Sequence, residues 1–338
     1  MNNIKDILFD LCRADGIGNV REASTLSHDI LSQYCRVRYT DTLTVIGEMK
    51  GEGDYTLMLD AHIDEIGFIV TDIDNKGFLT VDKCGGIDLR TLPARRVKIH
   101  GKQDVIGVFC STPPHLSSGE VEFDDIKKIK IDSLLGEGAK DIISIGDFVT
   151  FFDEPAVLNE TKVTAKALDD RAGVVCLLEL ARRLSGKTLP VNVVFALSDA
   201  EALGVRGAKT ATFDISPDEA IALDVSFADG PDIPSTECGK LSGGAMIGVS
   251  PILDRQISNT LLSIAKENNI PCQTEVMAGR TGTNGDAISL NKTGVRTGLV
   301  SIPERNMHTA VEVVDLRDIT AVCDILEQYI LKGGVKNA

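Results

Sequence analysis

The chain has 338 residues, 43% of them hydrophobic and 25% charged, which is the composition of an ordinary globular protein and a length that suggests two domains. Its 50 acidic and 35 basic residues give a net charge of −15, so phosphate groups would repel it, and neither nucleic acid nor an anionic membrane is an expected partner. No run approaches the ~20 apolar residues of a membrane span. The eight cysteines are scattered without a Cys-x-x-Cys pair, which favours buried free thiols and hence a cytoplasmic protein without a signal peptide.

The N-terminal part is predicted to contain two helices and two strands. Apolar residues at helical spacing from Ile4 to Cys12 predict an amphipathic helix, and a second helix is expected at about residues 21–34, after a glycine-rich turn. Strands are expected at residues 44–50 and from Leu57, because short apolar runs bounded by turn residues are typical of strands.

The residue pattern changes between residues 69 and 161. Short β-branched runs alternate with Gly, Pro and Asp turns, and no long helical pattern interrupts them. Such spacing predicts a small all-β, barrel-like module. We expect this module to be inserted into a discontinuous α/β domain made of residues 1–68 and 162–338.

Helices and strands alternate from the end of this insert to the C-terminal region. Helices are expected at about residues 170–185, 204–212, 251–268, 283–290 and 315–331, and strands at 192–198, 221–225, 273–277 and 297–302. This alternation predicts a layered α/β domain, in which sites lie at the carboxyl ends of the strands.

The apolar run that begins at Leu57 ends in a cluster of polar side chains. His62 and Asp64 are two residues apart, so on an extended backbone both project to the same face. An imidazole beside a carboxylate is the beginning of a metal site, in which one group binds the ion and the other orients the ligand. An isolated His-x-Asp is more often structural, so a metal site needs further ligands.

Four later segments end in groups that a divalent metal prefers. They are Asp169 with Asp170 at a helix start, Asp199 with Glu201 after a strand, Asp224 at a strand end, and His308 after the last predicted strand. One of the adjacent aspartates is expected to cap the helix while the other faces the site. Two histidines and several carboxylates suit one or two divalent cations and metal-assisted hydrolysis. The residues alone leave a metallohydrolase and an α/β protein with scattered acidic strand ends equally open, and the Asp199–Glu201 pair also fits a carbohydrate hydrolase.

Several short motifs occur in a fixed order along nearly the whole chain. They are Ala61-His-Ile-Asp-Glu-Ile-Gly67, Ala167-Leu-Asp-Asp-Arg-Ala-Gly173, Gly204-Val-Arg-Gly-Ala208, Gly282-Thr-Asn-Gly-Asp-Ala-Ile288 and Met307-His-Thr-Ala-Val-Glu312. Together they resemble metallopeptidase family forty-two, the tetrahedral aminopeptidases. The resemblance implies an α/β catalytic domain with an inserted β domain for dimerisation, and homo-oligomers from a dimer to a tetrahedral dodecamer. It also implies two Zn²⁺ or Co²⁺ ions per subunit and the removal of N-terminal residues from peptide substrates.

The resemblance also implies the metal ligands, position by position. His62, Asp169 and Asp224 would hold one ion, and Asp169 would bridge to a second ion that His308 also holds. In related enzymes the peptide bond between Asp169 and Asp170 is cis.

Two more residues would act in the reaction that the resemblance implies. Asp64 would orient the ring of His62 without binding the metal itself. Glu201 would be the general base, which takes a proton from the attacking water and passes it to the leaving amine.

The sequence departs from the family at position 202. The family carries adjacent glutamates at 201 and 202, the second as a ligand of the second metal, but this chain has Ala202, whose methyl group cannot bind a metal. The second site then keeps only Asp169 and His308, where a catalytic zinc usually has three protein ligands. Asp199 is a candidate to replace the missing ligand. Otherwise the enzyme works with one metal, or the chain is an impaired paralogue that binds peptides or partners.

Overall fold

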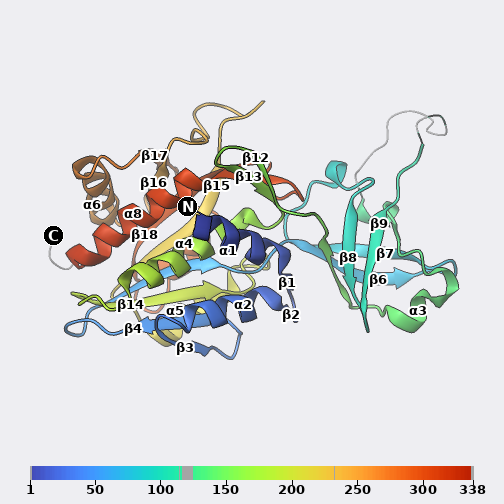
Figure 1. Ribbon diagram of the computed structural model, residues 1–338, viewed down its shortest axis with the longest axis horizontal. Coiled ribbons are helices and arrows are strands. Elements are labelled where there is room, and N and C mark those ends of the chain that lie inside the picture. Colours follow the sequence, from blue (N-terminus) through green and yellow to red (C-terminus); the bar gives the residue numbers. More distant parts are fainter. Residues whose placement is uncertain (1, 114, 116–124, 232, 336–338) are drawn as a thin grey trace.

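The computed structural model describes residues 2–113, 115, 125–231 and 233–335, and it contains a large α/β body with a smaller β-barrel beside it (Figure 1). Each body has an apolar core of its own. The chain enters the barrel directly after the strand that ends at His62 and returns to the α/β body after Phe151. The domain boundaries at 68/69 and 161/162 stay a prediction.

A mixed sheet of 11 strands, counted over the described ranges, forms the middle of the α/β body. Its strands in spatial order are β12 (Ala156–Asn159), β13 (Lys162–Ala165), β19 (Glu312–Asp315), β18 (Arg296–Arg305), β15 (Glu219–Phe227), β5 (Thr56–His62), β14 (Asn192–Ser198), β4 (Val45–Met49) and β3 (Arg36–Tyr39), with β16 (Ala245–Val249) and β17 (Cys272–Val276) branching from β18. The central strands β18, β15, β5 and β14 are parallel to one another, so their carboxyl ends lie at one edge of the sheet.

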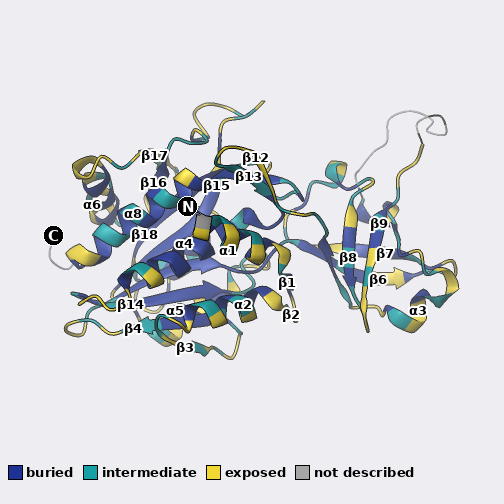
Figure 2. Ribbon diagram, in the orientation of Figure 1, coloured by how far each residue is buried: buried dark blue, intermediate teal, exposed yellow. Residues whose placement is uncertain are grey.

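Helices cover both faces of this sheet and bury its central strands (Figure 2). Side chains alternate between the faces, so that Leu57 and Leu59 of β5 belong to one apolar cluster and Met58 to the other. The first cluster contains residues of α1 (Asn2–Arg13), α2 (Glu22–Leu31), α4 (Leu168–Leu184), α6 (Arg255–Glu267) and α8 (Leu316–Lys332), and the second contains residues of α5 (Arg206–Ile215) and α7 (Asn284–Ser289). The layered α/β architecture predicted from the sequence is confirmed. No helix in the described part of the chain has the length and apolarity needed to cross a bilayer.

The smaller body is a closed β-barrel. Its strands in spatial order are β10 (Ile131–Asp132), β7 (Phe78–Cys84), β6 (Gly67–Ile73), β11 (Phe148–Phe151), β8 (Arg96–His100) and β9 (Asp104–Phe109). In its core the ring of Phe68 packs edge-on against Phe109 and Phe151, with centroids 5.0 and 5.5 Å apart. Closure leaves these strands without free edges. The one α-helix described in this part is the short α3 (Ala139–Ile142), with 3₁₀ turns at Leu89–Thr91, Ile126–Lys128 and Gly136–Gly138.

A two-stranded hairpin joins α1 to α2 and lies where the barrel meets the α/β body. Its strands are β1 (Gly16–Ile17) and β2 (Val20–Arg21). A side chain at Gly16 would place its Cβ 2.8 Å from Nη2 of the buried Arg171, so that guanidinium would have to shift to make room for any other residue. Gly18 has a φ of 55° and faces the ring of Phe148 in β11. The glycines predicted to form a turn therefore also let the hairpin lie close to both bodies.

Candidate metal centre

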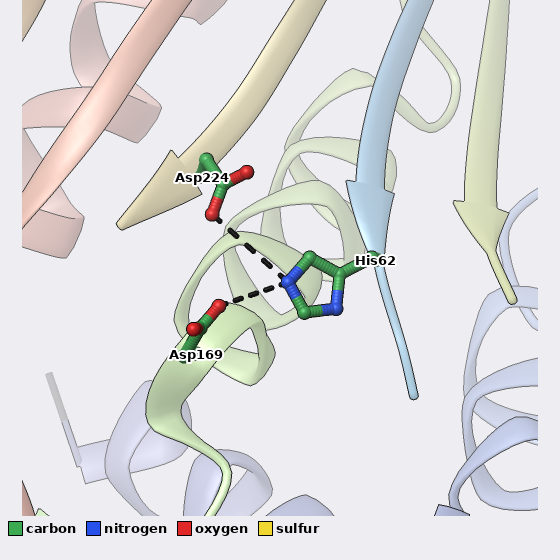
Figure 3. A group of neighbouring side chains, drawn as sticks. All are labelled: His62, Asp169 and Asp224. Carbon is green, nitrogen blue, oxygen red and sulfur yellow. Dashed lines mark hydrogen bonds and ion pairs between the residues drawn. The ribbon is translucent and has the colours of Figure 1, made fainter. Parts of the chain in front are cut away.

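Three predicted ligands meet at the carboxyl edge of the central sheet (Figure 3). His62 is the last residue of β5, Asp224 lies near the end of β15, and Asp169 lies in the first turn of α4. The distance from Nε2 of His62 is 2.8 Å to Oδ1 of Asp169 and 4.0 Å to Oδ1 of Asp224. One donor atom from each of the three side chains lies within 4.8 Å of the other two. The parallel register of β5 and β15 brings these side chains together.

His308, the fourth predicted ligand, lies on the other side of Asp169. Its Nε2 is 3.2 Å from Oδ2 of Asp169, so each oxygen of this carboxylate faces a different imidazole. The side chain of His308 is 45% exposed, whereas that of His62 is 5% exposed. Burial opposes the ionisation of Asp169, but the contacts with His308 and His62 outweigh it and lower the pKa of the carboxyl below its usual range.

The contacts of Nδ1 of His62 suit a ring that binds a metal through Nε2. Its Nδ1 lies 3.3 Å from the backbone oxygen of Asp64 and 3.5 Å from Oδ1 of the same residue. When a metal binds, a proton held on Nδ1 by these acceptors would leave the lone pair of Nε2 for the ion. One imidazole nitrogen and two carboxylate oxygens are donors that Zn²⁺ and Co²⁺ accept.

The carboxylates of this group repel one another, and a cation would offset that repulsion. Burial raises the pKa of Asp224 well above its usual value, and the charges of Asp170 and Asp169 raise it further. Asp224 and His62 are both buried, so water screens these charges little. The donor set therefore fits a divalent cation both in its chemistry and in its charge.

Asp64 has a second contact that the sequence analysis missed. Its Oδ1 accepts the backbone N–H of Glu201 at 2.9 Å, and its Oδ2 accepts that of Ala202 at 3.2 Å. One buried carboxylate therefore holds the His62 ring and also the turn that carries Glu201.

The Asp169–Asp170 peptide is cis. The side chain of Asp169 faces the two histidines, whereas that of Asp170 accepts backbone N–H groups. Asp170 accepts the backbone N–H of Gly173 at 3.0 Å, which caps α4, and that of His62 at 3.3 Å. Glu312, which the sequence analysis did not single out, accepts the backbone N–H of Asp169 at 3.2 Å and that of His308 at 3.0 Å. An acidic residue at each end of the short strand β19, Glu312 and Asp315, is the sequence signal that could have drawn attention to it.

A pocket of about 300 Å³ opens above these residues. Its lining consists of His62, Ile66, Gly86, Asp169, Glu201, Ala202, Gly204, Val205, His308 and Glu312. Burial raises the pKa of Glu201; the charge of His62 lowers it, while those of Asp64 and Asp169 raise it, and the net shift is upward. A carboxylate with a raised pKa inside a pocket is suited to move protons near neutral pH.

The profile of the M42 glutamyl aminopeptidase family matches residues 44–325. The chain belongs to this family. It is 32% identical over 286 residues to the lysyl aminopeptidase of Pyrococcus furiosus, with 81% of each chain covered. The resemblance found in the sequence motifs is thus confirmed, and the chain is a peptide hydrolase of the aminopeptidase type by family.

Solved structures of related peptidases have the same fold as this M42 chain. An aminopeptidase of the archaeon Desulfurococcus kamchatkensis superposes with a TM-score of 0.91 at 32% identity, covering 98% of this chain and 95% of its own. The TET1 peptidase of Pyrococcus horikoshii, which can assemble into a tetrahedron or a large octahedral shell, superposes with a TM-score of 0.87 at 29% identity, covering 97% and 99%.

In this M42 chain, Ala202 lies on the His308 side of the pocket. A Cβ built on Gly85 would be 3.3 Å from Cβ of Ala202, and one built on Gly86 would be 3.0 Å from Nδ1 of His308. Gly85 therefore lies beside Ala202, and the adjacent Gly86 lies beside His308. At the position where the family resemblance calls for a second glutamate, the pocket wall is a methyl group.

Asp199 does not line the pocket that contains His308. It lines a separate hollow of about 30 Å³ together with Asp64 and Leu203. Asp199 and Glu201 line different hollows because Ala200, between them, has a φ of 57° and breaks the extended alternation that would put both side chains on one face. The geometry supports neither Asp199 as a replacement ligand nor an Asp199–Glu201 pair facing one substrate.

Proposed function

We propose that this chain is a metal-dependent aminopeptidase that removes N-terminal residues from peptides and holds one divalent ion, Zn²⁺ or Co²⁺, tightly at His62, Asp169 and Asp224. The observation that carries the proposal is the convergence of these three donors, within 4.8 Å of one another, below the pocket of a chain of the M42 family. Their segments are far apart in sequence, and two of the side chains are buried among apolar strands.

The bound ion would lower the pKa of a water molecule and polarise the scissile carbonyl. Glu201 would accept the proton of that water, because its carboxylate lines the same pocket and has a raised pKa. It would then donate this proton to the departing amine, so that the new N-terminus leaves uncharged. Asp64 would keep Glu201 in place through the backbone N–H that it accepts, and would orient His62 at the same time.

A second ion would be held weakly. Asp169 and His308 offer one donor each on that side, and Ala202 offers none. Loss even of a residue that only supports a ligand typically weakens metal binding by about 10–100-fold, so loss of a ligand should cost at least as much.

Two further properties belong to the proposal. We expect a cytoplasmic protein, which fits eight cysteines that are all free. We also expect a homo-oligomer between a dimer and a tetrahedral dodecamer, by analogy with the tetrahedron that the Pyrococcus horikoshii peptidase can form. The motif resemblance implies that the barrel lies at the dimer contact. Sedimentation analysis of the purified chain tests this expectation, since a single species at 36.3 kDa would contradict it.

The direct test is the release of free amino acids from short unblocked peptides. We expect release that stops when a chelator removes the metal and returns when Zn²⁺ or Co²⁺ is added. N-terminally acetylated copies of the same peptides are the matched control and should not be cleaved.

Ala202 keeps a second candidate function open, that of a non-catalytic protein that binds peptides. Binding of unblocked peptides without release of any amino acid, with metal present at saturation, would favour it over the peptidase.

A further inference from the structure

A cluster of five charged side chains is buried where the hairpin, the barrel and the α/β body meet. Its members are Asp15, Glu65, Lys98, Lys166 and Arg171. Four of them are no more than 3% exposed, and the side chain of Lys98, from barrel strand β8, is 16% exposed. Removing so many charges from water is costly unless each finds a partner.

Lys166 is the centre of this cluster. Its Nζ lies 2.7 and 3.0 Å from the two oxygens of Glu65 and 2.9 Å from Oδ1 of Asp15. Burial lowers the pKa of Lys166, but the charges of Glu65 and Asp15 outweigh it, so the pKa is raised and the ammonium stays charged. Asp15 in turn contacts Lys98 of the barrel, and its pKa is lowered to about 2 because Lys166 and Lys98 outweigh the effect of burial.

The cluster borders two of the three segments that supply the proposed metal ligands, those of His62 and Asp169. Glu65 directly follows Asp64, and Lys166 precedes Asp169 by three residues. Arg171, two residues after Asp169, donates from Nε to the backbone oxygen of Ile63 at 2.7 Å.

Backbone contacts extend these ties to the hairpin. Oε1 of Glu65 accepts the backbone N–H of Gly16 at 2.9 Å and lies 3.5 Å from Nη2 of Arg171. The contacts of Arg171 with Glu65 and Ile63 therefore link the segment of His62 and Asp64 to the first turns of α4.

We propose that Lys166 is a positioning residue for the metal centre: by holding Glu65 and Asp15, it sets the distance between the turn at His62–Asp64 and Asp169. This inference rests on the proposed metal site at His62, Asp169 and Asp224. Lys166 does not line the pocket and would contact neither the ion nor the substrate. It acts through Glu65, whose backbone continues that of Asp64, and through its own short connection to Asp169.

The test is the binding of Co²⁺ to the full-length Lys166→Met variant, followed by the visible absorption of the bound ion. Methionine keeps most of the length of lysine but leaves Glu65 and Asp15 without their shared cation, so these carboxylates should move apart. We expect Co²⁺ affinity to fall at least about tenfold. We also expect a changed absorption spectrum, because the positions of the bands depend on the arrangement of the ligands. Lys166→Arg, which keeps the charge, should restore the affinity in part.

Arg183→Met is the matched control. Arg183 lies near the C-terminal end of α4, where it donates to Glu179 and Asp324 at 2.7 Å each. Its loss should lower the unfolding temperature without changing the affinity or the spectrum of Co²⁺, which separates positioning from stability.

Each outcome has one meaning. A folded Lys166→Met variant with the wild-type affinity and spectrum would overturn the positioning role. If Lys166→Met is not recovered folded, Glu65→Gln removes the charge that Lys166 holds and must weaken Co²⁺ binding in the same way, or the inference fails. Wild-type protein that does not bind Co²⁺ would instead overturn the proposed function on which the inference rests.

Discussion

The two oxygens of Asp169 face surroundings that differ in burial and in the number of donors. Oδ1 faces His62, whose side chain is 5% exposed, and Asp224 completes a group of three donors, of which His62 and Asp224 are buried. Oδ2 faces His308, which is 45% exposed, and the wall beside that histidine is the methyl group of Ala202.

The buried side is also the better supported of the two. Asp64 and Asp170 hold His62 through its ring and its backbone N–H, and Arg171 holds the residue between His62 and Asp64. We call the half of the centre that contains His308 and Ala202 the open side. There, Glu312 accepts the backbone N–H of His308, but the ring of His308 is exposed to solvent. A metal centre whose ligands are fixed before binding loses less entropy when the ion arrives. We therefore expect one tight site and one weak site that share a single carboxylate.

Substitution of the shared ligand should have the largest effect, because it damages both sides at once. In Asp169→Asn the charge between His62 and His308 is lost, and we expect metal affinity to fall at least about 100-fold, with loss of peptidase activity. Calorimetric titration with Zn²⁺ measures the affinity. Asp199→Asn, in the neighbouring hollow, is the control and should bind metal as the wild type does. Equal binding by Asp169→Asn would refute the shared site.

Substitution of the proposed base should separate chemistry from metal binding. Glu201→Gln keeps the size and the backbone contact with Asp64 but cannot accept a proton. We expect kcat to fall by about 10²–10⁴-fold while the tight ion is retained. Unchanged turnover in this variant would rule out the role assigned to Glu201.

Restoring a donor at position 202 should strengthen the open side alone. In Ala202→Glu we expect the weak site to gain at least about tenfold in affinity, so that a second equivalent of metal survives desalting. The Ala202→Gln variant introduces a side chain of about the same volume as glutamate but without its charge, so its affinity for the second ion should increase less. If neither variant takes up a second ion, the weakness of the open side has another cause than the missing carboxylate.

The smallest expected effect is on the pH profile. Because the pKa of Glu201 is raised above the ordinary glutamate value of about 4.3, and a base acts only when deprotonated, kcat/KM should fall as the pH drops through that higher value. The profile is measured with metal at saturation at every pH. A rate that stays constant down to about pH 4.3 would contradict the raised pKa.

The apolar patterns of the sequence predicted the central strands and most helices, because these elements are buried and their periodicity is strong. Strands at the margins were missed: β12 is exposed along its whole length, and β3, although polar and apolar residues alternate in it, is only four residues long and at best half-buried. The helix predicted from residue 251 begins at Arg255, because the side chain of Asp254 caps it at that point.

The candidate site was predictable where its residues lie toward the carboxyl ends of buried strands, as His62 and Asp224 do. It was not predictable where one backbone angle decides the direction of a side chain, as Ala200 does for Asp199. The supporting contacts of Asp64, Glu312 and Lys166 join segments far apart in the chain, and nothing in local spacing records them.

The metal content of the wild-type chain tests most directly whether the two metal sites that share Asp169 differ in affinity. Protein equilibrated with Zn²⁺, desalted and measured by plasma mass spectrometry should retain close to one equivalent per chain, held by His62, Asp169 and Asp224. Close to two equivalents would contradict this difference between the sides and would mean that Asp169 and His308 bind an ion tightly without a carboxylate at position 202.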